Sequence, residues 1–220
     1  MDHDNLPPVL PLYTLEQPLL LPGTVVPFAL TEPGERAMVE DALEGDRYLG
    51  IVQPLEAEAP AARARKDGRP AIYSVGCVAY IGEWHETEPD RYLVLAGGVT
   101  RFRIVGEAPC DRGYRRVMVD YEEFREDAGQ IELELDFPRL RDLVRQRIEA
   151  NDAEIDLSIM EKMAGTEIVT AIAHAISLSV AERQVLMETP SLRELEDVLL
   201  QLMIGPGGLP SFDIQFSSPS

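Results

Sequence analysis

The first half of the chain carries apolar residues at the two-residue period of β-strands. From Val9 to about Phe124, branched and aromatic residues recur, and glycine, proline and aspartate stand at the breaks between runs. The pair Gly97-Gly98 between two runs predicts a tight hairpin or a β-bulge. The predicted strands are Arg47 to Gln53, Ile72 to Trp84, Tyr92 to Ala96, Val99 to Val105 and Tyr114 to Phe124.

The apolar run from Leu19 to Leu30 is interrupted by Pro22-Gly23 and by Pro27. It predicts two short strands joined by a turn. Because proline has no backbone N–H, the strand that contains Pro27 is not expected at the centre of a sheet. A short helix follows, since Pro33 suits a first helical turn and Gly45 can end the helix. Its apolar residues recur at helical spacing: Met38, Val39, Ala42 and Leu43.

One strand makes a specific prediction about burial. Between Thr100 and Ile104 the side chains alternate, so that Phe102 faces one way and Arg101 and Arg103 face the other. This is the pattern of a half-buried strand. It predicts that Phe102 lies in the core and that the two arginines do not.

From Asp136 onward the apolar residues follow the period of helices. Two capping boxes predict helix starts, Ser179 with Glu182 and Ser191 with Glu194, and Gly205-Pro206 predicts the end of the last helix. The apolar stripes are Leu140, Leu143, Val144 and Ile148; Val169, Ile172 and Ile176; and Leu192, Leu195, Val198, Leu199, Leu202 and Met203.

These patterns predict a β module over residues 1–125, a helical module over 126–205 and a flexible tail over 206–220. The segment from Pro54 to Pro70 has no apolar period and is expected to be a mobile surface loop. With 220 residues and 45% hydrophobic content, the chain can bury a sizeable core.

The charge of the chain argues against nucleic acid as a partner. There are 39 acidic and 20 basic residues, a formal net charge of −19, which repels a phosphate backbone. The sequence has two basic clusters. We expect the first to belong to a solvated loop and the second to the polar face of a sheet. They are Arg63, Arg65, Lys66 and Arg69, and then Arg112, Arg115 and Arg116 near Arg101 and Arg103.

No stretch approaches the roughly 18 uninterrupted apolar residues that a membrane span requires. The acidic start, Met1 to Asn5, differs from a basic signal peptide. We therefore expect a soluble, cytoplasmic protein that does not bind membranes. Cys77 and Cys110 have no metal-ligand spacing, so we expect two reduced, structural thiols.

Catalytic patterns are largely missing from the sequence. There is no glycine-rich phosphate loop ending in Gly-Lys-Ser/Thr, and neither of the two lysines, Lys66 and Lys162, lies in a buried setting that would activate it. His85-Glu86 lacks the second histidine of a zinc protease helix, because position 89 is proline. His174 lies on an apolar helix and is expected to be structural. We therefore predict no catalytic, cofactor-binding or metal-binding residues.

Two stretches in the same order resemble the N-terminal, substrate-binding domain family of Lon proteases. The first is Leu19 to Phe28, which continues through Glu32-Pro33 to Leu43. The second comprises Val75 to Ala79, Arg91 to Leu95 and Gly98 to Ile104. Family members usually carry an arginine and an aromatic residue after the Glu-Pro pair, whereas this chain has Gly34-Glu35 before Arg36. No role of that aromatic residue is carried over to this chain.

The resemblance implies an α+β fold: a PUA-like bent sheet or barrel with one short helix, followed by a helical bundle. It also implies non-catalytic recognition of unfolded or extended polypeptide, with a protease or chaperone as a further candidate partner. A groove between sheet and bundle would suit an extended segment, through edge-strand pairing or apolar contacts.

The helical half also holds methionines whose flexible side chains suit varied partners, although core packing is the simpler interpretation for each of them. They are Met160, Met163, Met187 and Met203. Two alternatives stay open: a small-molecule or metal-dependent enzyme that uses Cys77, Cys110, His85 and carboxylates, and RNA binding by analogy with PUA domains. The sequence assigns neither peptide-binding residues nor an oligomeric state.

Overall fold

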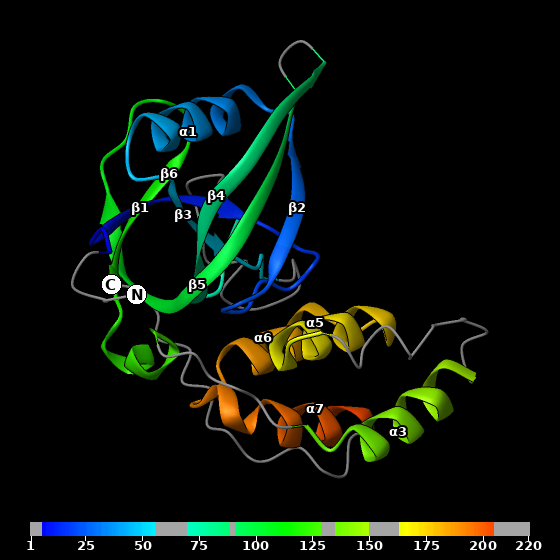
Figure 1. Cartoon of the computed structure of the whole chain (residues 1–220). Helices are drawn as coiled ribbons and strands as arrows, with labels where there is room; N and C mark the ends of the chain where they lie inside the picture. Colours follow the sequence, from blue (N-terminus) through cyan, green and yellow to red (C-terminus); the bar gives the residue numbers. More distant parts are fainter. Residues whose placement is uncertain (1–5, 56–69, 89–90, 129–134, 150–162, 205–220) are drawn as a thin grey trace.

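The computed structural model describes residues 6–55, 70–88, 91–128, 135–149 and 163–204. Figure 1 shows a strongly bent sheet with helix α1 at one end and a layer of helices at the other. The strands are β1 (Val9–Thr14), β2 (Val25–Leu30), β3 (Tyr48–Val52), β4 (Val75–Glu88), β5 (Arg91–Ala108) and β6 (Arg115–Asp120). The helices are α1 (Pro33–Glu44), η2 (Glu122–Ala128), α3 (Phe137–Glu149), α5 (Gly165–Ala175), α6 (Val180–Met187), η3 (Leu192–Glu194) and α7 (Leu195–Ile204). The predicted α+β class is confirmed.

The sheet closes into a barrel and leaves one strand outside the closure. Its strand order is β2-β5-β4-β3-β1-β6, and β5 also pairs with β6. Strands β5, β4, β3, β1 and β6 therefore form a ring, and β2 is an edge strand added to β5. This position confirms the expectation from Pro27, because an edge strand tolerates a missing backbone donor.

Three strand predictions in the first half need correction. The strand predicted from Tyr114 to Phe124 ends at Asp120, because the helical segment η2 begins at Glu122. Leu19–Leu21 form no strand but an irregular segment that is almost completely buried. The runs on either side of Gly97-Gly98 form one strand, β5, rather than a hairpin. The bulge is confirmed, since Val78 pairs with Thr100 whereas Ala79 pairs with Gly98, which leaves Val99 as the extra residue.

The close approach of two backbones explains why glycine is needed beside this bulge. A Cβ atom at Gly98 would lie 2.2 Å from the carbonyl oxygen of Leu21. The buried segment Leu19–Leu21 can therefore cross β5 only where a side chain is missing. At the neighbouring Gly97, an added Cβ would meet nothing nearer than Val25, at 4.0 Å.

The helical predictions are largely confirmed. The residues of the last two stripes are all buried, as are Leu140 and Val144, while the side chain of Ile148 lies outside the described residues. Ser179 and Glu182 form the predicted capping box, with Ser179 N–H donating to Glu182 and Glu182 N–H donating to Ser179 Oγ. Ser191 instead caps the short turn η3, where its Oγ accepts from Arg193 N–H, and α7 begins at Leu195.

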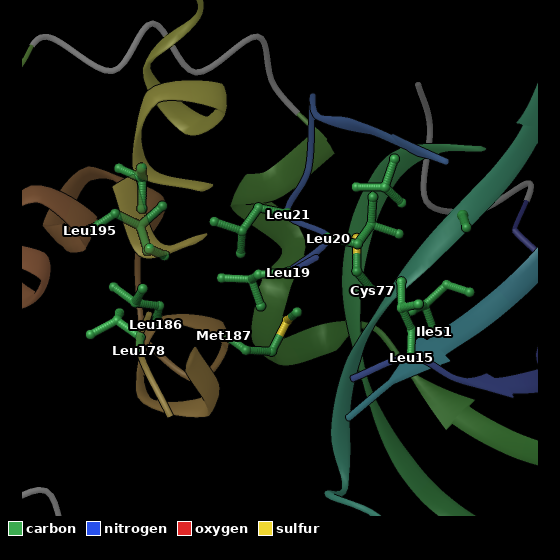
Figure 2. Packing of buried hydrophobic residues seen from close by; sticks show 14 of the residues in the cluster. Leu15, Leu19, Leu20, Leu21, Ile51, Cys77, Leu178, Leu186, Met187 and Leu195 are labelled. Atoms are coloured by element: carbon green, nitrogen blue, oxygen red, sulfur yellow. The ribbon is translucent and has the colours of Figure 1, made fainter. Parts of the chain in front are cut away.

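The barrel and the helices share one apolar core. Figure 2 shows Leu19 and Leu21 facing Leu186 and Leu195 from the helices, whereas Leu20 lies on the side of Cys77 and the sheet. A second, smaller cluster fills the inside of the barrel around Phe102. The seam between sheet and helices is thus filled along these residues, and the groove expected between sheet and bundle stays a prediction. The module boundary at residue 125 stays a prediction, although buried side chains from both sides of it are in one cluster.

Polar side chains are also buried in this seam. Gln184 Oε1 of α6 accepts from Gln53 Nε2 at 2.9 Å, and Gln184 Nε2 donates to the carbonyl of Val75 at 3.1 Å. Arg183 Nε donates to Gln53 Oε1 at 3.2 Å. Burial lowers the pKa of Arg183 and raises the pKa of Glu188, which accepts a hydrogen bond from Gln184. Helix α6 is therefore fixed to β3 and β4 by directional contacts as well as by apolar packing.

Arg101 is the main exception to the sequence prediction. It is completely buried, together with Phe102. Its Nε and Nη2 donate to the two carboxylate oxygens of Asp127, both at 2.8 Å, and its Nη1 donates to the carbonyls of Met187 and Thr189. The guanidinium also lies over the Phe124 ring, 4.5 Å from its centroid. One side chain thus joins β5, η2 and the end of α6.

The predicted alternation of Arg101 and Phe102 along β5 is correct, but the prediction that the Arg101 side faces solvent is wrong. Phe102 faces the interior of the barrel, and Arg101 faces the opposite side. That side is covered by η2 and α6 instead of solvent, so both faces of β5 are buried at this point. Arg103 behaves more as predicted, because its ion pair with Glu123 is partly exposed.

We expect Gly98→Ala to lower the free energy of unfolding by about 1 to 3 kcal/mol, because the new methyl group collides with the Leu21 carbonyl. Gly97→Ala is the matched control and should change the free energy of unfolding by less than about 1 kcal/mol. Urea denaturation of both variants checks this. Equal losses would mean that Leu19–Leu21 does not cross β5 at Gly98.

We expect Arg101→Ala to lower the free energy of unfolding by about 3 to 5 kcal/mol, because it leaves the Asp127 carboxylate buried without a counter-charge. Arg103→Ala removes a partly exposed ion pair and should cost less than about 1 kcal/mol. Chemical denaturation followed by circular dichroism measures both. A small loss for Arg101→Ala would contradict the burial of this pair.

Candidate functional site

The candidate site is the solvent-facing side of β2, β5 and β4, which we call the outer face. Residues directly opposite each other in neighbouring antiparallel strands project to the same side of a sheet. The register places three rows across this face: Val25, Gly97 and Tyr80; Pro27, Leu95 and Glu83; and Ala29, Leu93 and His85. The residues on β2 and β5 in these rows are all apolar. Figure 1 shows the three strands side by side, with β4 and β5 projecting past α1 as a long hairpin.

Several of these apolar side chains are exposed to solvent. Val25 is 63% exposed, Tyr80 38% and Leu93 37%. The alternate residues of β2, such as Val26 and Phe28, are buried on the other side of the sheet. The sheet is therefore anchored through one face and presents a second apolar face to solvent. Contiguous exposed apolar surface of this kind is typical of an interaction site.

The free edge of β2 is poorly suited to pairing with another strand. Gly98 N–H donates to the Thr24 carbonyl, so Thr24 faces β5 with its backbone groups. In an antiparallel pair, alternate residues form the hydrogen bonds between the strands. The backbone groups of Val25, Pro27 and Ala29 therefore point away from β5, toward the open edge. Proline offers no donor there, and the Ala29 carbonyl already accepts from the Tyr13 hydroxyl at 3.3 Å. Because one backbone donor is missing and one acceptor is occupied, this blunted edge resists the addition of another strand.

The Tyr13 hydroxyl remains a donor at neutral pH. Burial, followed by the nearby carboxylates of Glu35 and Glu32, raises the pKa of Tyr13 to about 12. Its ring also stacks on Phe28, with 4.9 Å between the ring centroids. The outer face is thus equipped to bind through side chains more than through backbone pairing.

The β4 side of the outer face is polar. Glu83 and His85 are exposed, and their side chains have no hydrogen-bond or ion-pair partner within the described part of the chain. On the opposite side of the same hairpin, Trp84 is 42% exposed, and its ring centroid is 5.7 Å from that of Tyr92. The projecting hairpin therefore carries apolar side chains on both of its sides.

The residues considered for catalysis do not come together. Cys77 is fully buried, His85 and His174 are exposed, and Cys110 is half-buried in the segment before β6. Burial, and then the Asp127 carboxylate, raise the pKa of the Cys77 thiol, which disfavours the reactive thiolate. Within the described ranges, no group of histidine, cysteine and carboxylate side chains could hold a metal ion. Lys66 and Lys162 lie outside the described residues.

The predicted basic cluster on the sheet is largely neutralised by carboxylates. Arg112 pairs with Asp41, and Arg115 pairs with Glu107. Arg101 and Arg103 pair with Asp127 and Glu123. The other cluster, Arg63 to Arg69, lies outside the described residues. None of the described helices is both long enough and apolar enough to span a membrane.

The outer face was missed by sequence reasoning, although β2 carries a signal for it. A half-buried strand usually alternates apolar and polar residues, but the outward positions of β2 are Val25, Pro27 and Ala29. A row of apolar residues at outward positions of an edge strand is typical of an interaction surface. The methionines of the helical half are not exposed in this way, since Met187 and Met203 are buried and Met163 is partly buried. Met160 lies outside the described residues.

The sequence from residue 9 to residue 204 matches the family described as the ATP-dependent protease La (LON) substrate-binding domain. The chain belongs to this family. Lon protease 2 of Myxococcus xanthus is 26% identical over 215 residues, and the Lon protease of Anaeromyxobacter dehalogenans is 25% identical over 215 residues. Each alignment covers 92% of this chain but only 24% of the relative, so the chain spans about a quarter of the length of these proteases.

Solved structures of Lon N-terminal domains have the same fold. The N-terminal domain of the Mycobacterium avium complex Lon protease superposes with a TM-score of 0.61 at 20% identity, covering 89% of this chain and 98% of that domain. A Lon N-terminal domain protein from Xanthomonas campestris gives a TM-score of 0.58 at 20% identity, covering 89% of this chain and 97% of that one. The α+β architecture predicted from the family resemblance is thereby confirmed.

Proposed function

We propose that this substrate-binding domain recognises unfolded or extended polypeptide without catalysing a reaction, and that the outer face is its binding surface. The observation that carries the proposal is the row of exposed apolar side chains on β2 and β5, led by Val25 and Leu93. Family membership supports polypeptide as the ligand. The blunted edge of β2 favours contact through side chains over strand addition.

A catalytic role receives less support from the described residues. The thiol of Cys77 is buried with a raised pKa and lies far along β4 from the exposed His85. A role in RNA binding is also disfavoured, because the net charge is −19 and Arg103, Arg112 and Arg115 pair with carboxylates. The family name refers to a protease, and a separate protease or chaperone that receives the bound polypeptide is part of this proposal.

The test is the binding of a permanently unfolded model protein, reduced and alkylated, to the full chain, measured by fluorescence anisotropy. We expect Val25→Asp and Leu93→Asp each to weaken binding by at least about tenfold, or about 1.4 kcal/mol, since a carboxylate would be desolvated against apolar ligand groups. Both positions are exposed, so the variants should fold, which thermal denaturation checks.

Met118→Asp is the matched control. Met118 is 42% exposed on β6, outside the three rows of the outer face, and its substitution adds the same charge. It should leave binding nearly unchanged. Equal weakening by all three variants would show a general charge effect, and no weakening by Val25→Asp and Leu93→Asp would show that the outer face is not the binding surface.

A further inference from the structure

We propose that the outer face prefers polypeptide segments whose apolar residues are accompanied by lysine or arginine, and that Glu83 sets this preference. This inference rests on the proposed function and adds a substrate class to it. Glu83 lies in the same row as Leu95 and Pro27, at the β4 border of the apolar surface. An extended segment whose apolar side chains rest on β2 and β5 can therefore bring a flanking cation to this carboxylate.

The carboxylate of Glu83 is available for a ligand. Its residue is exposed, and its side chain has no hydrogen-bond or ion-pair partner among the residues that the structure describes. Some other carboxylates are engaged by arginines: Glu107 of β5 pairs with Arg115, and Glu123 of η2 pairs with Arg103. Glu83 differs from Glu107 and Glu123 because it combines a free carboxylate with an adjacent apolar surface.

The charge of the whole chain acts in the same direction. Each arginine–carboxylate pair is neutral, so the net charge of −19 is carried by carboxylates outside such pairs. An acidic protein attracts cationic segments and repels acidic ones within about one Debye length, roughly 8 Å at physiological salt. Glu83 places part of this charge at the site itself, where it can discriminate between segments of equal hydrophobicity.

The experiment compares three labelled peptides that share one apolar core and carry flanking lysine, glutamine or glutamate residues. With the full chain we expect the lysine peptide to bind about two- to fivefold more tightly than the glutamine peptide, the range of an exposed charge pair, and the glutamate peptide to bind most weakly. The difference should shrink when salt is raised to about 0.5 M.

Variants separate the local effect from the general one. Glu83→Gln should reduce the preference for lysine, and Glu83→Lys should reverse it. Glu126→Gln makes the same change in net charge on η2, beside the buried Asp127 and away from the hairpin, and should leave the preference nearly intact. An equal effect of Glu83→Gln and Glu126→Gln would overturn the assignment of Glu83.

The outcome also distinguishes this inference from the proposed function. If all three peptides bind equally while Leu93→Asp weakens each of them, the outer face binds polypeptide and the charge preference is wrong. If Leu93→Asp leaves the binding of every peptide unchanged, the proposed binding surface is itself wrong.

Discussion

A buried ion pair joins the two halves of this protein. The Arg101 guanidinium lies where β5, η2 and the end of α6 meet, and its carboxylate partner Asp127 is buried with it. Removing two charges from water is costly, and the cost is recovered only where the geometry is good and the remaining donors are satisfied. Here two donors bind Asp127 and others bind the carbonyls of Met187 and Thr189. This arrangement holds the helices in one orientation on the barrel.

The fixed seam determines which surface is left for recognition. Helices cover the side of the barrel that carries Cys77 and Arg101. Helix α1 adds its buried residues, such as Met38 and Val39, to the same core cluster. The added strand β2 and the projecting β4–β5 hairpin extend the sheet beyond this cover (Figure 1). Their outward apolar residues are consequently exposed. A rigid scaffold with a projecting apolar sheet can bind varied segments without reorganising its own core.

Much of the fold followed from local patterns, because the apolar period and the capping residues are local signals. The edge position of β2 came from Pro27 alone, and the last two helical stripes came from spacing. The burial of Arg101 could not be foreseen in this way. Its alternation with Phe102 was predicted correctly. The residues that cover its side chain are distant in sequence, however: Asp127 lies 26 positions away, and Met187 and Thr189 lie more than 80 positions away. Likewise, only the observed register brings Leu93 beside Ala29 and His85.

The central claim is that polypeptide binds to the outer face, and methyl NMR spectroscopy of the intact chain tests it most directly. Titration with the unfolded model protein should shift the methyl signals of Val25, Leu93 and Leu95. Signals of Val105, Met118 and Ile204, which are also exposed but lie elsewhere, should stay in place. Shifts confined to this second group, or to the methyl groups of α5, α6 and α7, would contradict the account.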